Sequence, residues 1–571
     1  MTGKAVDNPL FRPTYRLLGL SLLVGAIGAF AALGFDFLVD LAERLILVGI
    51  TGYEPPAAGT LTPTVDLPQG LERAWLPVAT TLGALAGALL VWRFAPEAEG
   101  HGTDAAIAAY HHHGGEVRAR VPAVKALASA LTIGSGGVAG REGPTAQIAV
   151  GLTTLVARWT GLRGEEKRVL LLAGMAAGLA AMFRAPLGMA IFAVEILYSG
   201  MVFESEALIY TVIAAVTAYA LTGLFTGWHP LFEIPEGLAF DEPASLLAFA
   251  LLGLLAGVLG AILPALFYGV RDLFARLRVP VWLKPAIGGL LVGLAAIAAP
   301  QILGTGYGWI ELAMAGQLSL GMVLLLLVVK APGMALTVGS GASGGIFAPT
   351  VTLGAMLGAA VGILVERGFP MLDAPVAGFV VVGMAAVFAA AARTPISTLI
   401  MVVEMTAGYG LIVPAMLANV LAFLVQRALT HGRRYPTLYR SQVEHRELSP
   451  LHRGVFVRRA VDLLESGDLD ASEIRLPSLL NLLRYGEPIE IGEADGALVA
   501  VVVEPGAEVD GGTIAETIGR VQGATAVAVL RANEVLIPRG STTLAAGDQV
   551  LAVVRGASRE ALERLAAAPP R

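Results

Sequence analysis

Lys125–Thr145, KALASALTIGSGGVAGREGPT, returns 205 residues later as Lys330–Thr350, KAPGMALTVGSGASGGIFAPT. Without gaps the two segments share 11 of 21 positions, including the lysine, the Gly-Ser-Gly turn and the final Pro-Thr. A second pair, Gly174–Ile196 and Gly383–Met405, shares 11 of 23 positions at an offset of 209 residues. The chain therefore contains an internal duplication, and its glycine-rich turns recur in both halves.

The composition is that of a membrane protein. Of the 571 residues, 56% are hydrophobic and only 15% are charged, with a mean hydropathy of +0.71, which is too apolar for a soluble globule. Gly and Pro interrupt many of the apolar stretches, which predicts short and broken helices. Duplicated membrane transporters often place their ion path at interrupted helices where the repeats meet. We therefore expect an all-α polytopic membrane protein with an inverted repeat, acting as a transporter and not as an enzyme.

The chain is expected to divide into four parts. These are a cytoplasmic head (1–14), a membrane domain (15–441), a helical linker (442–485) and a small cytoplasmic α+β domain (486–571). Within the membrane domain, repeat one spans about 15–227 and repeat two about 244–429, with a Pro-rich loop between them. In the last part, runs such as ALVAVVVEP predict strands, TIAETIGRV predicts a short helix and Asn533-Glu534 predicts a hairpin.

The charge pattern sets the expected orientation. Basic residues gather at His431–Arg440, just after the last apolar stretch, so the C-terminal end is predicted to be cytoplasmic. Lys4, Arg12 and Arg16 indicate the same for the N-terminus. The net charge of −6 gives no nucleic-acid footprint, and the absence of cysteine excludes a disulfide framework. The expected location is the plasma membrane of a prokaryote, with both termini cytoplasmic.

Each glycine-rich turn leads into Pro-Thr, as expected where a helix begins. The N–H groups of a first helical turn have no partner within the helix, and the helix dipole adds partial positive charge, so such ends attract anions. Two facing ends would bind chloride without a full positive charge and would still release it. A dinucleotide site at Gly134–Gly140 is the alternative, but the βαβ frame and the acidic residue that it needs are missing.

Glu142 lies inside the first of these turns. A carboxylate in a membrane helix break is costly and is functional by default. Near helix N-termini it would be stabilised as an anion and would occupy an anion position, so its protonation or displacement would open the path. A salt bridge with Arg141 is the alternative. In the second repeat the matching residue is Phe347, an apolar wall. The repeated pairs Glu195/Glu404 and Lys125/Lys330 are expected to be structural, capping or balancing polar backbone.

GREGP at Gly140–Pro144, GIFAP at Gly345–Pro349 and the paired GMAA…P…E segments resemble the CLC family of chloride channels and proton/chloride exchangers, from about residue 15 to Tyr439. The resemblance implies a homodimer with one anion path per subunit, no cofactor and no metal. The resemblance implies that Glu142 is the gate and that the backbone amides of Ile346 and Phe347 contact the bound anion. It also implies that the Tyr439 hydroxyl helps to close the inner side of the path. The full anion-binding set that it implies is His101, Gly102, Thr103, Gly140, Arg141, Gly143, Gly345, Ile346, Phe347, Ala348 and Tyr439.

The first anion motif departs from the family pattern. The family has GSGIP where this chain has Gly100-His101-Gly102-Thr103-Asp104. His101 would either donate a hydrogen bond to the anion or turn aside, and when charged it would hold anions more strongly at acidic pH. The choice between chloride and nitrate stays open. Asp104 is expected to point away from the path, because a carboxylate in it would repel anions.

The second departure concerns protons. In many family exchangers a glutamate follows the one at the position of Glu195, but here Ile196 stands in its place. The proton-accepting carboxylate is absent, which favours a chloride channel, with a proton-coupled chloride or nitrate exchanger as the alternative. The methionine of fluoride-exporting relatives is also missing, so fluoride is less expected.

A run of three histidines, His111-His112-His113, suggests a metal site. Adjacent histidines lack the i, i+4 spacing with which a helix directs two ligands to one ion. The surrounding polar stretch, AYHHHGGEVRAR, is better interpreted as an aqueous loop between helices.

Val535–Val554, VLIPRGSTTLAAGDQVLAVV, resembles the RCK C-terminal (TrkA-C-like) module of potassium channels and transporters. The resemblance implies a dimeric regulatory unit that binds a small ligand, such as a cyclic dinucleotide, with a purely assembling module as the alternative. It also raises cation transport as a rival function. That function needs several carboxylates, carbonyls or hydroxyls converging at the midplane, and the two matched turns hold one carboxylate.

Overall fold

The structure is a computed structural model in which two compact units divide the chain, Met1–Gln442 and Val443–Arg571. It describes residues 15–449 except 57, 60–66, 69, 236, 237 and 373, then 489–491, 496–555 except 505, 522, 532 and 533, and finally 562, 565 and 566. The predicted head and nearly all of the predicted linker lie outside the described residues.

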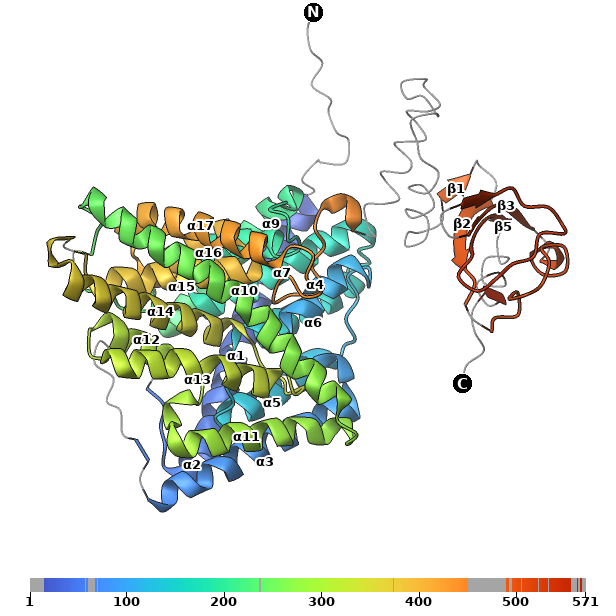
Figure 1. Cartoon of the computed structure of the whole chain (residues 1–571). Helices are drawn as coiled ribbons and strands as arrows, with labels where there is room; N and C mark the ends of the chain where they lie inside the picture. Colours follow the sequence, from blue (N-terminus) through green and yellow to red (C-terminus); the bar gives the residue numbers. More distant parts are fainter. Residues whose placement is uncertain are drawn as a thin grey trace, which may run out of the picture. The chain divides into compact units, whose positions relative to one another are not determined.

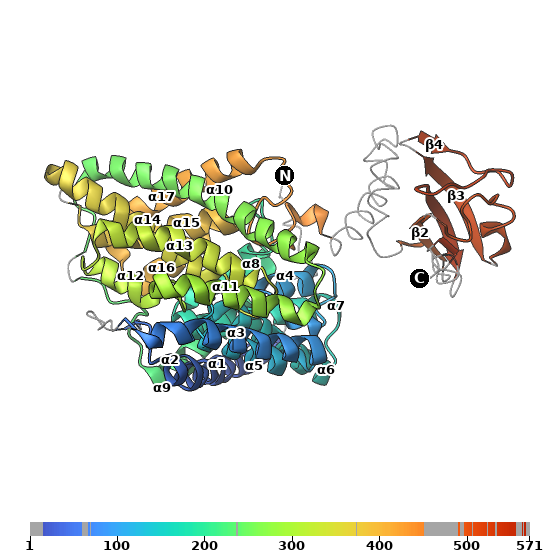
Figure 2. The same cartoon turned by 60° about the horizontal axis from the view of Figure 1, so that its bottom comes forward.

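The first unit is built of helices, as predicted (Figure 1). The first repeat contains α1 (Tyr15–Ala42), α2 (Gly49–Thr51), α3 (Leu71–Phe94), α4 (Thr103–His111), α5 (Val121–Gly134), α6 (Glu142–Trp159), α7 (Gly164–Phe183), α8 (Pro186–Glu195) and α9 (Leu208–Thr226). The second contains α10 (Leu246–Arg276), α11 (Lys284–Ala298), α12 (Tyr307–Met314), α13 (Leu320–Val338), α14 (Phe347–Gly368), α15 (Val376–Ala392), α16 (Pro395–Thr406) and α17 (Ile412–Thr430). In Figure 2 most helices of the first repeat lie below those of the second, as two adjoining halves.

Both halves combine long helices with short ones. Among the described residues, eight helical stretches are long and apolar enough to cross a membrane. By contrast α4, α8, α12 and α16 have only 9, 10, 8 and 12 residues, where a straight span needs about 20. Their ends lie inside the protein, so other protein groups must satisfy the freed backbone groups.

Two glutamates provide such partners reciprocally. At the end of α8, Glu195 accepts hydrogen bonds from the amides of Ile396 (3.2 Å) and Ser397 (2.8 Å), in the first turn of α16. Glu404, near the end of α16, accepts from the amides of Leu187 (3.1 Å) and Gly188 (2.7 Å), in the first turn of α8. The capping role predicted for the pair is confirmed. Because each helix caps the other, α8 and α16 run in opposite directions, as an inverted repeat requires.

Two buried lysines act in the same paired manner. The ammonium group of Lys125 donates to the carbonyls of Ala98 (3.0 Å) and Gly100 (2.6 Å), just before α4. Lys330 donates to the carbonyls of residues 302, 303 and 304, just before α12, at 2.9–3.2 Å. Both lysines are fully buried. They hold the chain where it turns into a short helix, so their predicted structural role is confirmed.

The second unit is a five-stranded antiparallel sheet with strand order β1-β2-β5-β3-β4. The strands are β1 (Ile489–Ile491), β2 (Gly496–Val502), β3 (Ala524–Arg531), β4 (Glu534–Leu536) and β5 (Gln549–Arg555). Arg531 pairs with Glu534, so β3 and β4 form the predicted hairpin, but Glu534 belongs to β4 and not to the turn. The short helix predicted at TIAETIGRV is wrong: only Ile518–Arg520 forms a 3-10 turn. The Thr513 side chain bonds Glu516, and Gly519 has low helix propensity.

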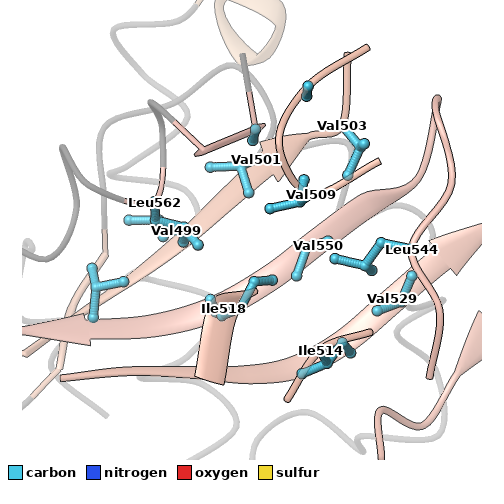
Figure 3. Packing of buried hydrophobic residues seen from close by; sticks show 14 residues of the cluster. Val499, Val501, Val503, Val509, Ile514, Ile518, Val529, Leu544, Val550 and Leu562 are labelled. Carbon is cyan, nitrogen blue, oxygen red and sulfur yellow. The ribbon is translucent and has the colours of Figure 1, made fainter. Parts of the chain in front are cut away.

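The core of this unit is aliphatic. Figure 3 shows Val499 and Val501 of β2 in one core cluster with Val550 of the adjacent strand β5 and Val529 of β3, the strand beyond it. Beside this core one buried carboxylate is fully engaged. Asp548 accepts two hydrogen bonds from the Arg531 guanidinium, at 2.8 and 2.6 Å, and one from the Ala545 amide at 2.8 Å. Burial opposes the charge, but these bonds outweigh it and hold the pKa of Asp548 below its ordinary value.

We expect Asp548→Asn to destabilise the second unit by about 1–3 kcal/mol, because it removes a charged acceptor from buried donors. The folded pKa lies below the unfolded one, so this stabilisation is complete above about pH 5 and is lost as the pH falls through the folded pKa. Hydrogen exchange of β3 and β5 amides in the full-length protein measures both effects. Glu508→Gln, at an exposed side chain, is the control. Equal protection of these amides from exchange in the wild type and in both variants would contradict the role of Asp548.

Candidate anion site

The glycine-rich turns of the two repeats meet. Gly140 and Gly345 donate their amides to each other's carbonyls, with both N···O distances 2.8 Å. The adjacent Gly344 donates to the carbonyl of Gly100 at 3.2 Å, which adds the turn before α4 to the group. Three segments far apart in the sequence are therefore joined through their backbones.

Only glycine permits this approach. A Cβ atom on Gly143 would lie 2.0 Å from the carbonyl oxygen of His101, and one on Gly102 would lie 2.5 Å from the carbonyl oxygen of Gly143. Gly102 also has a φ of 84°, a conformation that other residues rarely adopt. The predicted residues of the first motif and of the GREGP turn are thus in direct contact.

Helix N-termini surround this meeting point. Helices α4, α6 and α14 begin at Thr103, Glu142 and Phe347, each directly after one of the joined turns. Helix α12 begins at Tyr307, whose hydroxyl reaches Glu142. The structure thus brings together the predicted turn residues Gly140, Arg141, Gly143, Gly345, Ile346, Phe347 and Ala348. The first-turn amides have no partner within their own helices, and together with the helix dipoles they make this region favourable for an anion.

The carboxylate of Glu142 occupies this region. The side chain is buried, and its Oε1 atom accepts a hydrogen bond from the Tyr307 hydroxyl. Its Oε2 atom lies against Gly140 and the start of α14, where a Cβ on Gly140 would be 2.1 Å from it. Oε2 is buried without a hydrogen bond of good geometry to a described residue, but the backbone amides of Glu142 and Ala348, in the first turns of α6 and α14, lie close enough to stabilise the charged carboxylate. The Glu142 carboxylate therefore lies among helix N-termini, where partial positive charge favours an anion.

Arg141 does not pair with Glu142. Its guanidinium is hydrogen-bonded to Asp36 and, at 2.8 Å, to Asp40, both on α1. Glu43 lies 3.9 Å away. The salt bridge with Glu142 that we kept as an alternative is therefore wrong, because the acidic side chains of Asp36, Asp40 and Glu43 hold the guanidinium instead.

Phe347 forms an apolar wall, as predicted from its place in the repeat. Its ring packs against Phe183 and Phe388, with centroids 4.4 and 4.3 Å away. Because Phe347 stands where the first repeat has Glu142, α14 places no second carboxylate at the meeting point of the turns.

Aromatic rings lie at the other end of the site. The Tyr439 side chain is buried, its hydroxyl is hydrogen-bonded to the Thr103 side chain, and its ring stands edge-on to His101 with centroids 5.4 Å apart. His101 Nδ1 accepts a hydrogen bond from the Asp104 amide at 3.4 Å, which leaves Nε2 to carry the proton. His101 thus bonds the first turn of α4 through one nitrogen and has an N–H donor on the other.

Asp104 lines the same cavity as His101, so the expectation that it points away from the path stays a prediction. Its carboxylate accepts a hydrogen bond from the Ser441 amide at 2.8 Å and lies 3.4 Å from the Arg440 side chain. It thereby fixes the segment that carries Tyr439. Both partners line a cavity of about 580 Å³ together with His101, Arg271 and Arg118, which makes this cavity the vestibule on the Tyr439 side.

A second cavity, of about 390 Å³, lies on the Glu142 side. It is lined by Tyr307, Arg141, Arg184 and the end of α9, together with the acidic residues Asp36, Asp40, Glu43 and Glu54. The candidate site thus lies between two vestibules, with a buried carboxylate toward one and buried aromatic rings toward the other.

Sequence reasoning missed Tyr307. A signal for it exists, because Gly304-Thr305-Gly306-Tyr307 repeats the Gly-x-Gly pattern of Gly100–Thr103 at an offset of 204 residues. All four of these glycines have positive φ, between 69° and 95°. The turn before α12 was thus recognisable as the repeat of the turn before α4, although its contact with Glu142 was not.

Comparisons with known proteins agree with this arrangement. Residues 82–427 match the family described as voltage gated chloride channel, and residues 498–567 match the TrkA-C domain. The H(+)/Cl(-) exchange transporter ClcA of Yersinia pseudotuberculosis serotype IB (strain PB1/+) is 33% identical over 415 residues, which are 72% of this chain and 84% of that protein. ClcA of Yersinia pestis bv. Antiqua (strain Angola) is 36% identical with the same coverage.

Solved structures share the fold. A slow cyanobacterial Cl−/H+ antiporter superposes with a TM-score of 0.65 at 24% identity, over 75% of this chain and 96% of that one. A CLC-type fluoride/proton antiporter superposes with a TM-score of 0.62 at 21% identity, over 76% and 100% of the two chains. The names of the curated relatives favour exchange over the channel that Ile196 led us to expect.

We expect Glu142→Gln to raise chloride efflux from proteoliposomes and to abolish its pH dependence, because an amide is neutral at every pH and binds dipoles more weakly. Tyr307→Phe should act in the same direction but less, since it removes one hydrogen bond to a charged group, worth about 1.5–3 kcal/mol. Tyr409→Phe, at a side chain that is 63% exposed, is the control. Unchanged efflux in Glu142→Gln would exclude this carboxylate as the gate.

Proposed function

Because the chain belongs to the voltage-gated chloride channel family, we propose that it exchanges chloride for protons across the membrane. The observation that carries this proposal is the position of the Glu142 carboxylate. It lies buried at the meeting of helix N-termini, with one oxygen held by Tyr307 and with the backbone amides of Glu142 and Ala348 close to the carboxylate.

This position links the two ions. An anion and the charged carboxylate compete for the same dipoles, so chloride binds there only when the carboxylate has left. Protonation removes the charge of Glu142 and weakens its hold on the site. Proton binding to Glu142 therefore favours chloride binding, and by thermodynamic reciprocity chloride favours the proton. Such linkage is the minimum that coupled exchange requires.

Binding by dipoles suits transport. The buried cations around the site are bound to other groups: Arg141 to acidic residues of α1, and Lys125 and Lys330 to backbone carbonyls. None of these three cations is therefore available to bind chloride tightly. Weak binding at several points permits release as well as entry of the ion.

The anion preference depends on His101 in this proposal. Its Nε2–H group is a single neutral donor next to Tyr439, on the side of the larger vestibule. Chloride is the ion that we propose, and nitrate is the alternative whose relative flux the same liposome assay measures.

We further propose a homodimer, with one complete site per subunit and both termini in the cytoplasm. The His431–Arg440 segment supports the orientation through its basic residues. The TrkA-C-like unit would then be a cytoplasmic regulatory module. A small ligand, such as a cyclic dinucleotide, would bias transport if it binds one state of the protein more tightly than the other.

The exchange proposal predicts that an outward chloride gradient drives protons into proteoliposomes against their own gradient. The full-length protein is reconstituted, and internal pH and chloride are followed together. Chloride flux without any proton movement would instead show that the protein is a channel, as the replacement of the proton-accepting glutamate by Ile196 suggests.

Removal of residues 450–571 is expected to leave the ratio of chloride to nitrate flux unchanged. The truncated chain keeps Ser441, and with it the hydrogen bond to Asp104 that fixes the Tyr439 segment. The flux ratio under matched gradients is the measurement. A changed ratio would show that the C-terminal unit contributes to selectivity.

A further inference from the structure

The segment that joins the two repeats contributes to the vestibule next to Glu142. We call its residues 228–232 the strap. Leu231, within the strap, lines that vestibule together with Tyr307 and Arg184. The loop predicted from the sequence therefore lies close to the gate, and its contacts with the surrounding helices bear on the gate.

Hydrogen bonds to its backbone fix the strap at both ends. The Tyr219 hydroxyl of α9 donates to the carbonyl of Trp228 at 3.3 Å. The Phe232 amide donates to the carbonyl of Met405, in α16, at 2.9 Å. The strap therefore runs from the first repeat to the second.

Phe232 joins the strap to the gate. Its side chain is fully buried, and its ring stands edge-on to Tyr307, with centroids 5.2 Å apart and an angle of 86° between the planes. The Tyr307 hydroxyl in turn donates to the carboxylate of Glu142. Because edge-to-face aromatic pairs have a preferred geometry, Phe232 restrains the Tyr307 ring and thereby the hydroxyl that holds Glu142.

A histidine contact anchors the strap near its start. The Arg184 guanidinium, at the turn between α7 and α8, lies 2.7 Å from Nδ1 and 3.1 Å from Nε2 of His229. It also donates to the His229 carbonyl at 3.2 Å. A guanidinium only donates hydrogen bonds, so a ring nitrogen that accepts from it must be unprotonated. The contact therefore requires a neutral imidazole.

Protonation of His229 would break this contact. Both nitrogens of a charged imidazole carry protons, so neither can accept, and two positive charges would then face each other. The protonated Nδ1 has another partner at hand, since the carbonyl oxygen of Pro230 lies 3.2 Å from it. The titratable groups that act electrostatically on Arg184 are Asp36 of α1 and Tyr219 of α9.

The second repeat makes the equivalent contact with other groups. Arg393 follows Arg184 by 209 residues, and both arginines end a helix with a left-handed backbone, at φ 56° and 55°. Arg393 donates to Gln426 at 3.0 Å and to Thr430 at 2.8 Å, both in α17. Neither of these acceptors titrates. The first repeat thus places a titratable acceptor, His229, where the second has an amide and a hydroxyl.

We propose that Phe232 is a positioning residue for the Glu142 gate, and that the Arg184–His229 contact holds the strap in place while His229 is neutral. In the step, a hydronium ion gives its proton to His229 and leaves as water, and Arg184 is released. The strap then holds Phe232 less firmly against Tyr307, so the gate leaves the anion site more readily and chloride flux rises. This inference rests on the gate role of Glu142, and it holds whether chloride is exchanged for protons or conducted.

The first test replaces Phe232 in the full-length protein. We expect Phe232→Leu, which keeps an apolar side chain and removes the ring, to raise chloride efflux from proteoliposomes about two- to tenfold, the range that an edge-to-face pair supplies. Phe225→Leu, at a ring that is 65% exposed, is the matched control. The increase should vanish when Phe232→Leu is combined with Glu142→Gln, because a positioning residue acts through the gate. An increase of the same size in the double variant would contradict the proposal.

The second test compares efflux between about pH 8 and pH 5, with equal pH on both sides, because histidine ordinarily changes charge in this range. His229→Gln keeps an uncharged acceptor for Arg184, so its rise in efflux on acidification should be at most about half that of the wild type. His229→Lys is positively charged and has no acceptor, so it should raise efflux above that of the wild type at about pH 8. His431→Gln, at an exposed histidine outside the strap, is the matched control.

The outcomes separate this inference from the proposals above. Unchanged efflux in Glu142→Gln would refute the gate and this inference with it. Raised efflux in Glu142→Gln together with wild-type efflux in Phe232→Leu would refute the strap alone, and so would a wild-type pH profile in both His229 variants. If Phe232→Leu does not fold, the exposed His229→Lys decides. Proton movement in the same liposomes tests exchange independently of all these variants.

Discussion

The two hydrogen bonds between Gly140 and Gly345 are the contact on which the rest of the site depends. They close the backbones of both repeats against each other where two helices begin, and a Cβ on Gly345 would lie 2.8 Å from the Gly140 carbonyl oxygen. Buried backbone groups must be paired within the protein in a membrane. This pairing satisfies one donor and one acceptor of each turn and leaves the first amides of α6 and α14 facing the same space. The position of the dipoles is therefore set by backbone contact and does not depend on any charged side chain.

The duplication supplies a symmetric frame, and the function lies where the symmetry is broken. Lysines before the short helices and glutamates at the ends of α8 and α16 make equivalent bonds in both halves. At the meeting point the halves differ, because Glu142 faces an apolar wall at Phe347. Thr103 and Tyr307 begin equivalent helices, yet one bonds the Tyr439 hydroxyl and the other bonds Glu142. A symmetric frame thus holds one carboxylate between two unlike ends.

Local patterns in the sequence predicted where the helices at the site begin and which buried charged residues have a structural role. Glycines followed by Pro-Thr mark helix starts by themselves, and the repeated glutamates and lysines show their structural role through their symmetry. The contacts of Tyr307 with Glu142 and of Asp104 with Ser441 join residues 165 and 337 positions apart, and no periodicity encodes them. The polar histidine run was interpreted as a loop, but His111 is the buried last residue of α4, and its Nε2 atom lies 3.1 Å from the Leu197 carbonyl oxygen. In the C-terminal unit, side-chain bonds and a glycine overruled a helical pattern.

The Arg141 contacts decide how strongly the site can attract an anion. A guanidinium next to the gate would bind chloride strongly if it were unpaired, since Coulomb attraction grows as the local dielectric falls. Here its guanidinium is hydrogen-bonded to Asp36 and Asp40 of α1. Both vestibules are lined by acidic and basic side chains in nearly equal number. The vestibule next to Glu142 has Asp36, Asp40, Glu43 and Glu54 beside Arg44, Arg141 and Arg184. The larger vestibule has Glu97, Glu99, Asp104 and Glu116 beside Arg118, Arg158, Arg271 and Arg440. Since neither mouth carries a strong charge of one sign, the attraction for an anion comes from the dipoles at the helix N-termini.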